Sequence, residues 1–268
     1  MIHPSAVVHP HAKIGEDVEI GPFAVIGENV EIGAGTKVMS SVVIDGWTTI
    51  GKNNRIFPGA IIGMAPQDFS YKGQRSFVKI GDNNDIREYV TIHRAADEDG
   101  LTCVGSDNLI MANVHIAHNC RIGNQVTMAN YVGLAGHSVV EDQAVLGGLL
   151  GIHQHTRIGR LCMVGGCSKI NKDLPPFSMV DGNPCRLFSM NFRGMRRRGI
   201  SQSSRLAIQK AITILGSCGL TIDAAIERID RELEHTPELE QFLAFLKAPS
   251  RMGVLNKARG VGARAHDI

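Results

Sequence analysis

The stretch Ile14-Gly-Glu-Asp-Val-Glu-Ile20-Gly-Pro-Phe-Ala-Val-Ile26-Gly-Glu-Asn-Val-Glu-Ile32 decides the fold, because it repeats one pattern of six residues. An aliphatic residue opens each hexad, glycine often follows it, and a small or β-branched residue comes four places after the aliphatic. The same phase extends outward from Ile2 to Ile170, with breaks at Asp68, Gln74 and Glu98. A period of six fits neither a helix nor an alternating strand, so it predicts a recurring unit of one short strand and one corner.

The hexads predict how the unit packs. A glycine after the aliphatic residue permits a positive φ at the corner, and the aliphatic side chain points into a core shared by successive turns. The pattern resembles that of the hexapeptide-repeat acyltransferases. This resemblance implies a mainly β fold, a left-handed parallel β-helix with three hexads in each coil. The left hand rests on the resemblance alone, because ordinary parallel crossovers are right-handed.

The repeat also predicts the domain organisation. We expect the β-helix to span residues 1–175, with loops extruded at about 68–79 and 92–103, because the aliphatic phase resumes after each interruption. A connector at 176–190 leads to a C-terminal α-helical domain at 191–248. Apolar stripes predict helices at 205–215 and 222–233, and Thr236-Pro237 is typical of the start of a third helix, ending near residue 247. The polar stretch 249–268 is expected to be a disordered tail.

Composition excludes several classes of protein. A net charge of +2 on 268 residues is too mild for a nucleic-acid-binding protein. No apolar run approaches the roughly 18 residues of an integral membrane segment, and the N-terminus carries no apolar signal core. The six cysteines lack the paired spacings of a zinc site or disulfide framework, which favours reduced thiols. We therefore expect a cytoplasmic protein.

Six of the 11 histidines lie between residues 93 and 155, and the coil period predicts how they stack. His118 and His137 are 19 residues apart, and His137 and His155 are 18 apart, which is close to one coil. His93 precedes His118 by 25 residues, or 19 after the six extra residues of the second loop are subtracted. Neighbouring coils are about 4.8 Å apart, so His93, His118, His137 and the 153/155 pair should form a ladder along one edge.

Three chemical interpretations of the ladder compete: solvated edge histidines without a task, a metal site and general-base catalysis. Zinc accepts three imidazoles, and the γ-type carbonic anhydrases share the fold, but their two ligands separated by four residues are missing here. No Asp or Glu flanks the ladder in the sequence, so we predict no metal. A neutral imidazole can take a proton from a hydroxyl, and Gly136 follows His118 by 18 residues. The Gly136 N–H would then stand beside the base and stabilise an oxyanion.

Several motifs together resemble those of the UDP-N-acetylglucosamine 3-O-acyltransferase family, which carries out the first step of lipid A biosynthesis. The resemblance covers the repeat and extends into the helical region. It rests on Pro66-Gln-Asp68, Val90-Thr-Ile-His-Arg94, Val104-Gly-Ser-Asp-Asn108, His115-Ile-Ala-His118, Leu134-Ala-Gly-His137, His153-Gln154, Val164-Gly-Gly-Cys167, Asp181-Gly-Asn183 and Arg197-Arg-Gly199.

The resemblance implies a role for each matching residue. His118 would be the general base that deprotonates the glucosamine 3-hydroxyl, and Gly136 would donate to the oxyanion. Gly166 would act as the stop of the acyl chain, and glycine there predicts a longer 3-hydroxyacyl group. The residues expected to bind the substrate's sugar, phosphates and nucleotide are Gln67, Asp68, His93, His115, His137, His153, Gln154, Asn191, Arg197 and Arg198.

The family resemblance also implies the partners. The acyl donor is a phosphopantetheine thioester on acyl carrier protein, which is a co-substrate, so no cofactor is expected. Basic groups such as Lys72, Arg75 and Arg160 would steer this acidic protein. One edge makes only half a cleft, which favours an oligomer, and the family forms a homotrimer with its sites between subunits.

Three departures from the family pattern leave the acceptor open. Asn119 stands where relatives commonly have Asp after the catalytic histidine, Ser70 where many have Lys, and Arg193 where Glu is expected. The acceptor is therefore either the 3-hydroxyl of UDP-N-acetylglucosamine or a 3-amino analogue. The related N-acyltransferases of the pathway carry a separate N-terminal nucleotide-binding domain, whereas the hexads here begin at residue 2. A non-catalytic scaffold is the alternative from another class.

Overall fold

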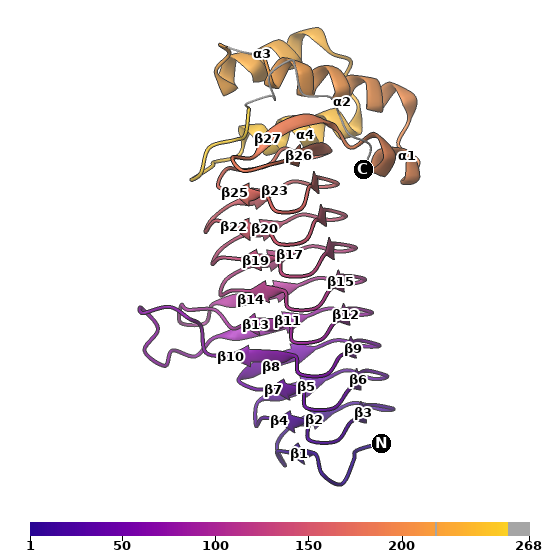
Figure 1. The fold of residues 1–268 in the computed structure, drawn as a ribbon, viewed down its shortest axis with the longest axis vertical. Coiled ribbons are helices and arrows are strands. Elements are labelled where there is room, and N and C mark those ends of the chain that lie inside the picture. The colour runs from indigo at the N-terminus through magenta and orange to yellow at the C-terminus, as the bar shows by residue number, and fades with distance from the viewer. Residues whose placement is uncertain (218, 257–268) are drawn as a thin grey trace.

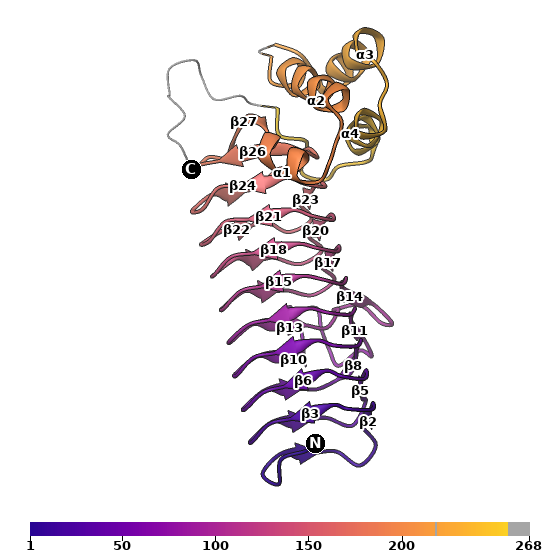
Figure 2. The ribbon, with the colours of Figure 1, turned by 90° about the vertical axis from the view of Figure 1, so that its right-hand side faces the viewer.

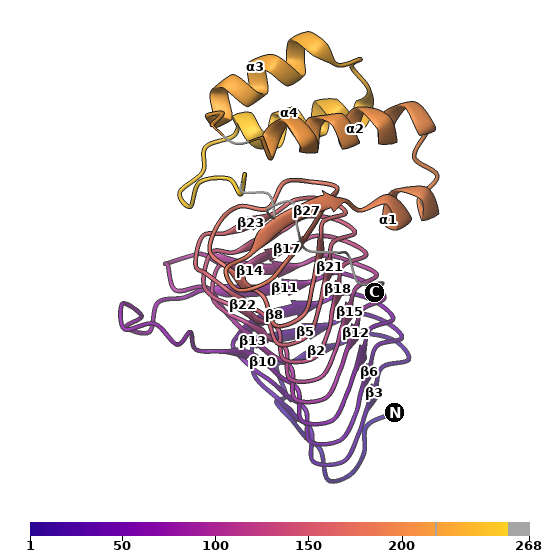
Figure 3. The ribbon, with the colours of Figure 1, turned by 45° about the horizontal axis from the view of Figure 1, so that its top comes forward.

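The computed structural model describes residues 1–217 and 219–256, which form a tall column of stacked coils with helices at its C-terminal end (Figure 1). Viewed from the helical end, the coils outline a triangle whose three sides are parallel sheets (Figure 3). The fold is a left-handed parallel β-helix, so the predicted fold class is confirmed.

Each side of the triangle receives every third strand of the coil. The nine-stranded sheet contains β1 (Val7–Val8), β4 (Val25–Ile26), β7 (Val43–Ile44), β10 (Ile61–Met64), β13 (Thr91–His93), β16 (His115–Ile116), β19 (Gly133–Leu134), β22 (Gly151–Ile152) and β25 (Lys169–Ile170). The eight-stranded sheet contains β2 (Lys13–Ile14), β5 (Val30–Ile32), β8 (Trp47–Ile50), β11 (Phe77–Ile80), β14 (Leu101–Val104), β17 (Arg121–Ile122), β20 (Val139–Val140) and β23 (Arg157–Ile158). The ten-stranded sheet contains β3 (Glu19–Ile20), β6 (Lys37–Val38), β9 (Arg55–Ile56), β12 (Asp85–Ile86), β15 (Leu109–Ile110), β18 (Thr127–Met128), β21 (Val145–Leu146), β24 (Met163–Val164), β26 (Ser178–Asp181) and β27 (Arg186–Met190).

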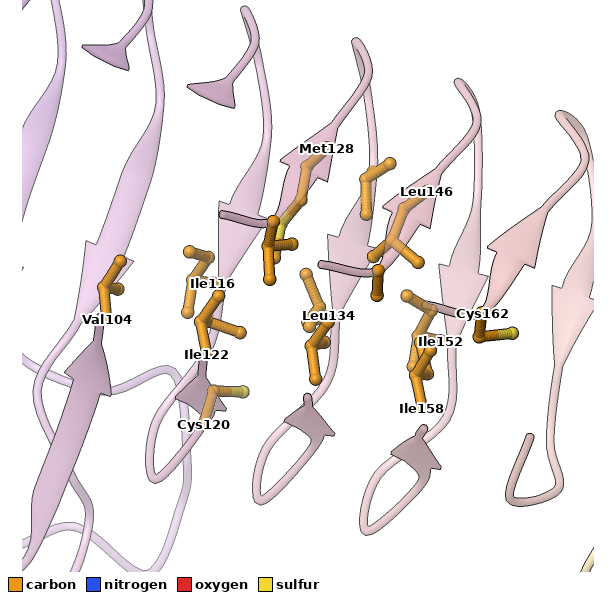
Figure 4. Close-up of a cluster of buried hydrophobic side chains, with 14 of the residues drawn as sticks. Val104, Ile116, Cys120, Ile122, Met128, Leu134, Leu146, Ile152, Ile158 and Cys162 are labelled. Atoms are coloured by element: carbon orange, nitrogen blue, oxygen red, sulfur yellow. The ribbon is translucent and has the colours of Figure 1, made fainter. Parts of the chain in front are cut away.

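The aliphatic phase of the sequence becomes the core of the column. Parallel pairing places Ile116 opposite Leu134 and Leu134 opposite Ile152, so that equivalent side chains lie over one another. These residues are buried, and Figure 4 shows them among the inward side chains of successive coils. Because each coil presents the same apolar side chains to the next, burial continues along the whole column.

The glycines that follow the aliphatic residues correct one prediction. Gly15 and Gly33 do not adopt a positive φ; that conformation occurs two places later, as at Asp17 and Gly35. What excludes a side chain at Gly33 is the next coil, since an added Cβ would lie 2.6 Å from the carbonyl carbon of Gly51. These glycines therefore permit close stacking of the coils rather than a left-handed turn.

A ladder of buried asparagines occupies the corner between the eight- and ten-stranded sheets. The Asn54 Oδ1 accepts hydrogen bonds at 2.9 Å from both the backbone and side-chain nitrogens of Asn84. Asn84 Oδ1 accepts equivalent bonds from Asn108 at 3.0 and 2.9 Å, and Asn108 in turn accepts from the Val126 N–H at 2.7 Å. Each amide thus satisfies a buried N–H of the following coil, which would otherwise destabilise the fold.

Two loops leave the column on one edge, at the left of Figure 1. They span 65–76, between β10 and β11, and 94–100, between β13 and β14. The first loop begins and ends three residues earlier than predicted because β11 already starts at Phe77. The second is shorter than predicted because β13 extends to His93 and β14 starts at Leu101. The Asp99 N–H donates to the Arg75 carbonyl at 2.8 Å, and the Ser76 hydroxyl donates to the Ala95 carbonyl at 2.6 Å. These bonds join the two loops into one wall.

The C-terminal region closes the upper end of the column. The expected connector at 176–190 contains a hairpin, because β26 extends the ten-stranded sheet and β27 pairs with it antiparallel. The helices are α1 (Phe192–Arg197), α2 (Gln202–Leu215), α3 (Ile222–Glu232) and α4 (Pro237–Lys247), as seen from the side in Figure 2. The Thr236 side chain accepts from the Leu239 N–H and caps α4, as its sequence predicted. None of the helices in the described ranges is long and apolar enough to cross a membrane.

The predicted disordered tail is wrong for residues 249–256. Val254 forms a parallel bridge with Asp173, the Leu255 N–H donates to the Asp173 carbonyl at 2.8 Å, and both apolar side chains are buried. The segment is ordered because it satisfies backbone groups above the last strand of the eight-stranded sheet. The rest of the predicted tail, 257–268, lies outside the described residues.

Candidate functional site

Most of the predicted site residues gather on one edge of the column, where the nine-stranded sheet turns into the eight-stranded sheet. His118 follows β16, Gly136 and His137 follow β19, and residues 153–155 follow β22. The two loops leave from the same corner, after β10 and β13. Because successive coils repeat the same turn, residues one coil apart become neighbours in space.

The histidines form two groups on this edge. The rings of His118 and His137 meet edge to face at 5.2 Å between centroids, and His137 stacks on His155 at 4.7 Å. His93 does not continue this ladder as predicted. It ends β13 and meets His115 at 5.1 Å, since its position belongs to the strand and not to the corner. The 18-residue distance from His137 predicts His155 in this ladder, as the structure places it, although His155 is absent from the residues expected to bind the substrate.

His118 is held at both ring nitrogens. Its Nδ1 lies 2.9 Å from Asn119 Oδ1, its Nε2 lies 3.3 Å from Asp68 Oδ2, and its side chain is 9% exposed. The sequence suggested that no acid flanks the ladder, which is wrong because the first loop folds back and delivers Asp68. Hydrogen bonds from Ser70 hold the pKa of the Asp68 carboxyl below its usual range, so it is ionised at neutral pH. Ser70 thus has a local task at this departure from the family pattern.

Gly136 lies against His118, as its spacing predicted. A Cβ at this position would lie 2.4 Å from both Nε2 and Cε1 of the imidazole, so only glycine leaves room for the ring. No described residue accepts a hydrogen bond from the Gly136 N–H. A free N–H beside a base provides the donor that a tetrahedral oxyanion requires.

Burial keeps His93 and His115, the second group of histidines on this edge, neutral. It lowers the pKa of His93 to about 4 and also lowers the pKa of His115. The Nδ1 of His115 is 2.7 Å from the Thr91 hydroxyl, whereas the buried Nδ1 of His93 has no partner among the described atoms. Neutral imidazoles can donate to and accept from sugar hydroxyls without adding charge to the site.

Arg94 fixes the first loop above the base. Its guanidinium donates to the Gly63 carbonyl at 2.8 Å and to the Tyr71 hydroxyl at 2.7 Å. This clamp positions the segment that carries Asp68. Gln67 is exposed on the same segment, and its predicted contact with the sugar stays a prediction.

The residues predicted to hold the nucleotide do not all reach this edge within one chain. Gln154 lies on it, and its side-chain nitrogen is 3.3 Å from His155 Nε2. Arg197 ends α1 and Arg198 is its C-cap, and both are exposed. Arg198 donates to Gln125 at 2.6 Å, at the corner between the eight- and ten-stranded sheets. Asn191 is buried, caps α1 through Gly194 and donates to the Leu161 carbonyl, so both its amide atoms are occupied.

Three further residues lie apart from His118. Gly166 sits at the corner between the ten- and nine-stranded sheets, where an added Cβ meets only backbone atoms of Gly148, at 3.2 and 3.7 Å. Arg160 donates to Gln241 at 2.9 Å beside a hollow between coil and helices, away from the ladder. His153 is exposed, with its Nδ1 3.1 Å from the Gln154 carbonyl.

The basic residues of the first loop flank the site. Lys72 donates to the Phe69 carbonyl at 2.8 Å, and Arg75 lies 3.8 Å from Asp99 across the two loops. Among the described residues, the group with three potential ligand atoms within 4.8 Å of one another is His9, His11 and Glu28, across the first two coils, not the ladder.

Known proteins are similar to this chain in sequence and in structure. A family model described as UDP N-acetylglucosamine O-acyltransferase, domain 2, matches residues 173–255, and a bacterial transferase hexapeptide model matches 104–136. A model of the GMPPB C-terminal domain matches 2–67. The acyl-[acyl-carrier-protein]–UDP-N-acetylglucosamine O-acyltransferase of Synechocystis sp. is 49% identical over 209 residues, 78% of this chain and 75% of that protein.

Solved structures agree over the whole length. LpxA from Acinetobacter baumannii has a TM-score of 0.92 at 42% identity, covering 95% of this chain and 99% of that one. LpxA from Bacteroides fragilis, a UDP-N-acetylglucosamine acyltransferase, has a TM-score of 0.92 at 40% identity, covering 95% and 100%. The edge that carries His118 and Gly136 is thus part of an acyltransferase scaffold, and the chain belongs to the acyl-carrier-protein-dependent UDP-N-acetylglucosamine O-acyltransferase family.

Proposed function

We propose that this chain transfers a 3-hydroxyacyl group from acyl carrier protein to the 3-hydroxyl of UDP-N-acetylglucosamine, the first step of lipid A biosynthesis, with His118 as general base. The observation that carries the proposal is the seating of His118. One ring nitrogen is 2.9 Å from the Asn119 carbonyl oxygen, while the other lies 3.3 Å from Asp68 and next to Gly136, whose N–H has no acceptor among the described residues. A base and an oxyanion donor on adjacent coils are what acyl transfer to a hydroxyl requires.

The reaction follows from these two groups. His118 Nε2 takes the proton of the sugar 3-hydroxyl while that oxygen attacks the thioester carbonyl. The carbonyl oxygen becomes an oxyanion and accepts from the Gly136 N–H. The C–S bond then breaks, the ester remains on the sugar, and the departing thiolate receives the proton from Nε2. No cofactor is needed, because the thioester is already activated.

Asp68 has a second task in this scheme. Its carboxylate lies 3.3 Å from Nε2 where the acceptor sugar must bind, so the sugar would displace this contact. The carboxylate then becomes available to accept from a sugar hydroxyl, and Nε2 becomes available as a base. His93, His115 and His137 line the remaining space on the same edge.

A homotrimer with sites between subunits would complete the cleft. Arg197 and Arg198 lie at the C-terminal end of α1, away from the His118 edge of the same chain, so a second chain is needed to bring phosphate-binding groups to it. Guanidinium groups suit this task because they match phosphate oxygens. Exposed apolar side chains also recur, on some of the coils, along the corner between the ten- and nine-stranded sheets: Phe23 (69% exposed), Tyr89 (64%), Tyr131 (56%) and Leu149 (61%). A row of this kind on a rigid column favours contact with another copy.

A 3-amino analogue of the sugar is the alternative acceptor. The neutral amine is a better nucleophile than a hydroxyl, and Asn119 in place of the family's Asp puts no carboxylate directly against the base. The expected cytoplasmic location stays a prediction.

An acyl-transfer assay with purified protein tests the proposal. It would offer UDP-N-acetylglucosamine and its 3-amino analogue against 3-hydroxyacyl carrier proteins of graded length. We expect O-acylation of the first sugar, and in His118→Ala a loss of turnover of about 10³-fold or more with nucleotide-sugar binding largely retained. Transfer to the 3-amine alone would replace the acceptor, and full turnover by His118→Ala would refute the base.

A further inference from the structure

The second loop brings a carboxylate to the back of the catalytic histidine. Asp97 Oδ2 accepts a hydrogen bond of 2.8 Å from the side-chain nitrogen of Asn119. The carbonyl oxygen of the same amide lies 2.9 Å from His118 Nδ1. Asp97, Asn119 and His118 therefore form a continuous chain from an exposed loop to the base.

The surroundings of Asn119 fix which end of its amide faces the imidazole. Besides Asp97 on its nitrogen, the amide receives the Ala96 N–H on its oxygen at 3.1 Å. Rotating the amide by half a turn would set its oxygen against the Asp97 carboxylate and its NH₂ group against the Ala96 N–H. Both contacts would be repulsive, so the observed orientation is the stable one.

This orientation selects one tautomer of His118. Because an amide oxygen only accepts, Nδ1 must carry the proton that it shares with Asn119. Nε2 is then the basic nitrogen once the acceptor sugar has displaced the Asp68 carboxylate, which lies 3.3 Å from it. The opposite tautomer would place the proton on Nε2, where no hydroxyl proton could be taken. Asn119 alone could not make this choice, since an amide presents a donor as readily as an acceptor.

We propose that Asp97 is a positioning residue for the acyl transfer: it orients Asn119, and through it keeps His118 in the tautomer whose Nε2 is the base. The inference rests on the proposed role of His118. It also explains Asn119, which departs from the family pattern: its amide links the Asp97 carboxylate to the imidazole through two hydrogen bonds.

Other charges face His118 and must be separated from the effect of Asp97. Asp68 lies on the Nε2 side, at 3.3 Å, and His137 meets the ring edge to face. His118 also lies near enough to His93, His115 and His155 for its positive charge to lower the pKa of each of these imidazoles. Asp97 differs from these because its hydrogen bond to Asn119 lies on the Nδ1 side. Its charge also acts on His137, where it opposes the lowering of the pKa by burial.

The first experiment compares Asp97→Ala with Glu98→Gln in the full-length protein. Both variants remove one acidic charge from the same loop, but Glu98 makes no described contact with Asn119. We expect Asp97→Ala to lower kcat about tenfold, since a charged hydrogen-bond partner is lost at an exposed position. The KM of both substrates should stay within about twofold, and Glu98→Gln should behave as the wild type.

The pH profile gives a readout that loop damage would not produce. Removing a negative charge near the imidazole disfavours its protonated form, so the acidic limb of the kcat/KM profile should move to lower pH in Asp97→Ala. The limb should not move in Glu98→Gln. Equal thermal midpoints for the two variants would exclude a general loss of structure.

A reciprocal pair provides the sharpest test. Asn119→Asp places two carboxylates 2.8 Å apart where one hydrogen bond now stands, so it should lower kcat although it restores the family's residue. Adding Asp97→Asn recreates the bond with its direction reversed, and the double variant should recover to within about threefold of the wild type.

Two results would overturn the inference: a double variant no better than Asn119→Asp, or an Asp97→Ala variant whose kcat equals that of Glu98→Gln. Either outcome leaves the proposed function intact provided that the wild type transfers acyl groups and His118→Ala does not. Failure of those two controls would instead remove the proposed function itself.

Discussion

Replacing Gly136 by alanine should disable the enzyme without unfolding it. The backbone φ at this position is not positive, so alanine adds no conformational strain. The new methyl group would lie 2.4 Å from His118 Nε2 and Cε1, against 3.4 Å or more in ordinary contacts. The imidazole must therefore withdraw by about 1 Å, and a misplacement of this size costs about 10²-fold in rate, or about 2.7 kcal/mol in the activation barrier.

The assay is steady-state acyl transfer with a matched glycine variant as control. Gly151 belongs to β22, one coil along, and an added Cβ there meets no atom within 4 Å, so Gly151→Ala should retain kcat within about twofold. Thermal unfolding of both variants should match that of the wild type. In a His118→Ala background, Gly136→Ala should leave the residual rate nearly unchanged, because the ring that the methyl displaces is absent.

Two results would refute this reasoning. A Gly136→Ala enzyme with kcat within threefold of the wild type would mean that the imidazole is not seated where the structure places it. A comparable further loss in the His118→Ala background would mean that the methyl group acts on something other than the ring, such as the direction of the oxyanion donor.

Three further predictions concern stability and donor choice. Since burial lowers the pKa of His93 from its ordinary value of 6.5 to about 4, the unfolded chain binds the extra proton, and the free energy of unfolding should fall by up to about 1.4 kcal/mol per pH unit as pH drops from 6.5 towards 4. Urea unfolding of the wild type and of His93→Gln at pH 7 and 5 checks this, and equal losses of stability would contradict it. Asn84→Ala removes the acceptor of the buried Asn108 N–H and should destabilise the fold by about 2 kcal/mol in denaturant unfolding; an unchanged midpoint would show that the ladder is dispensable. Gly166→Met fills the space at the proposed chain stop and should shift preference towards shorter acyl donors, and an unchanged donor profile would count against a ruler there.

The coil could be predicted from the sequence because each hexad meets the same environment. One residue type in each phase therefore identifies a buried position, and Ile116, Leu134 and Ile152 stack as their spacing requires. The spacing of about 18 residues per coil also predicts Gly136 beside His118, and His137 next along the same edge. His93 was misplaced because β13 extends through this residue, with a register shift against β10, and so keeps it in the strand instead of at the corner.

The coil period could not predict contacts that depend on the path of a loop. Asp68 and Asp97 reach His118 and Asn119 only because each loop folds back over the corner, which no periodicity encodes. The acidic run from Asp97 to Asp99 was the available signal for the second of these. Docking of residues 249–256 likewise depends on the unpaired backbone at the top of the eight-stranded sheet, a property of the finished column.

The docked segment 249–256 makes the two ends of the column differ in their ability to pair with another chain. Together with β26 and β27, it covers the backbone donors and acceptors that the last coil would offer to another chain. A stack of identical coils could otherwise extend into a fibre, since every coil presents the same ladder to the next. Head-to-tail growth needs a free ladder at both ends of each molecule, and one sealed end limits such pairing to two chains at most. The residues of β26, β27 and 249–256, which complete the fold, therefore also prevent the column from polymerising.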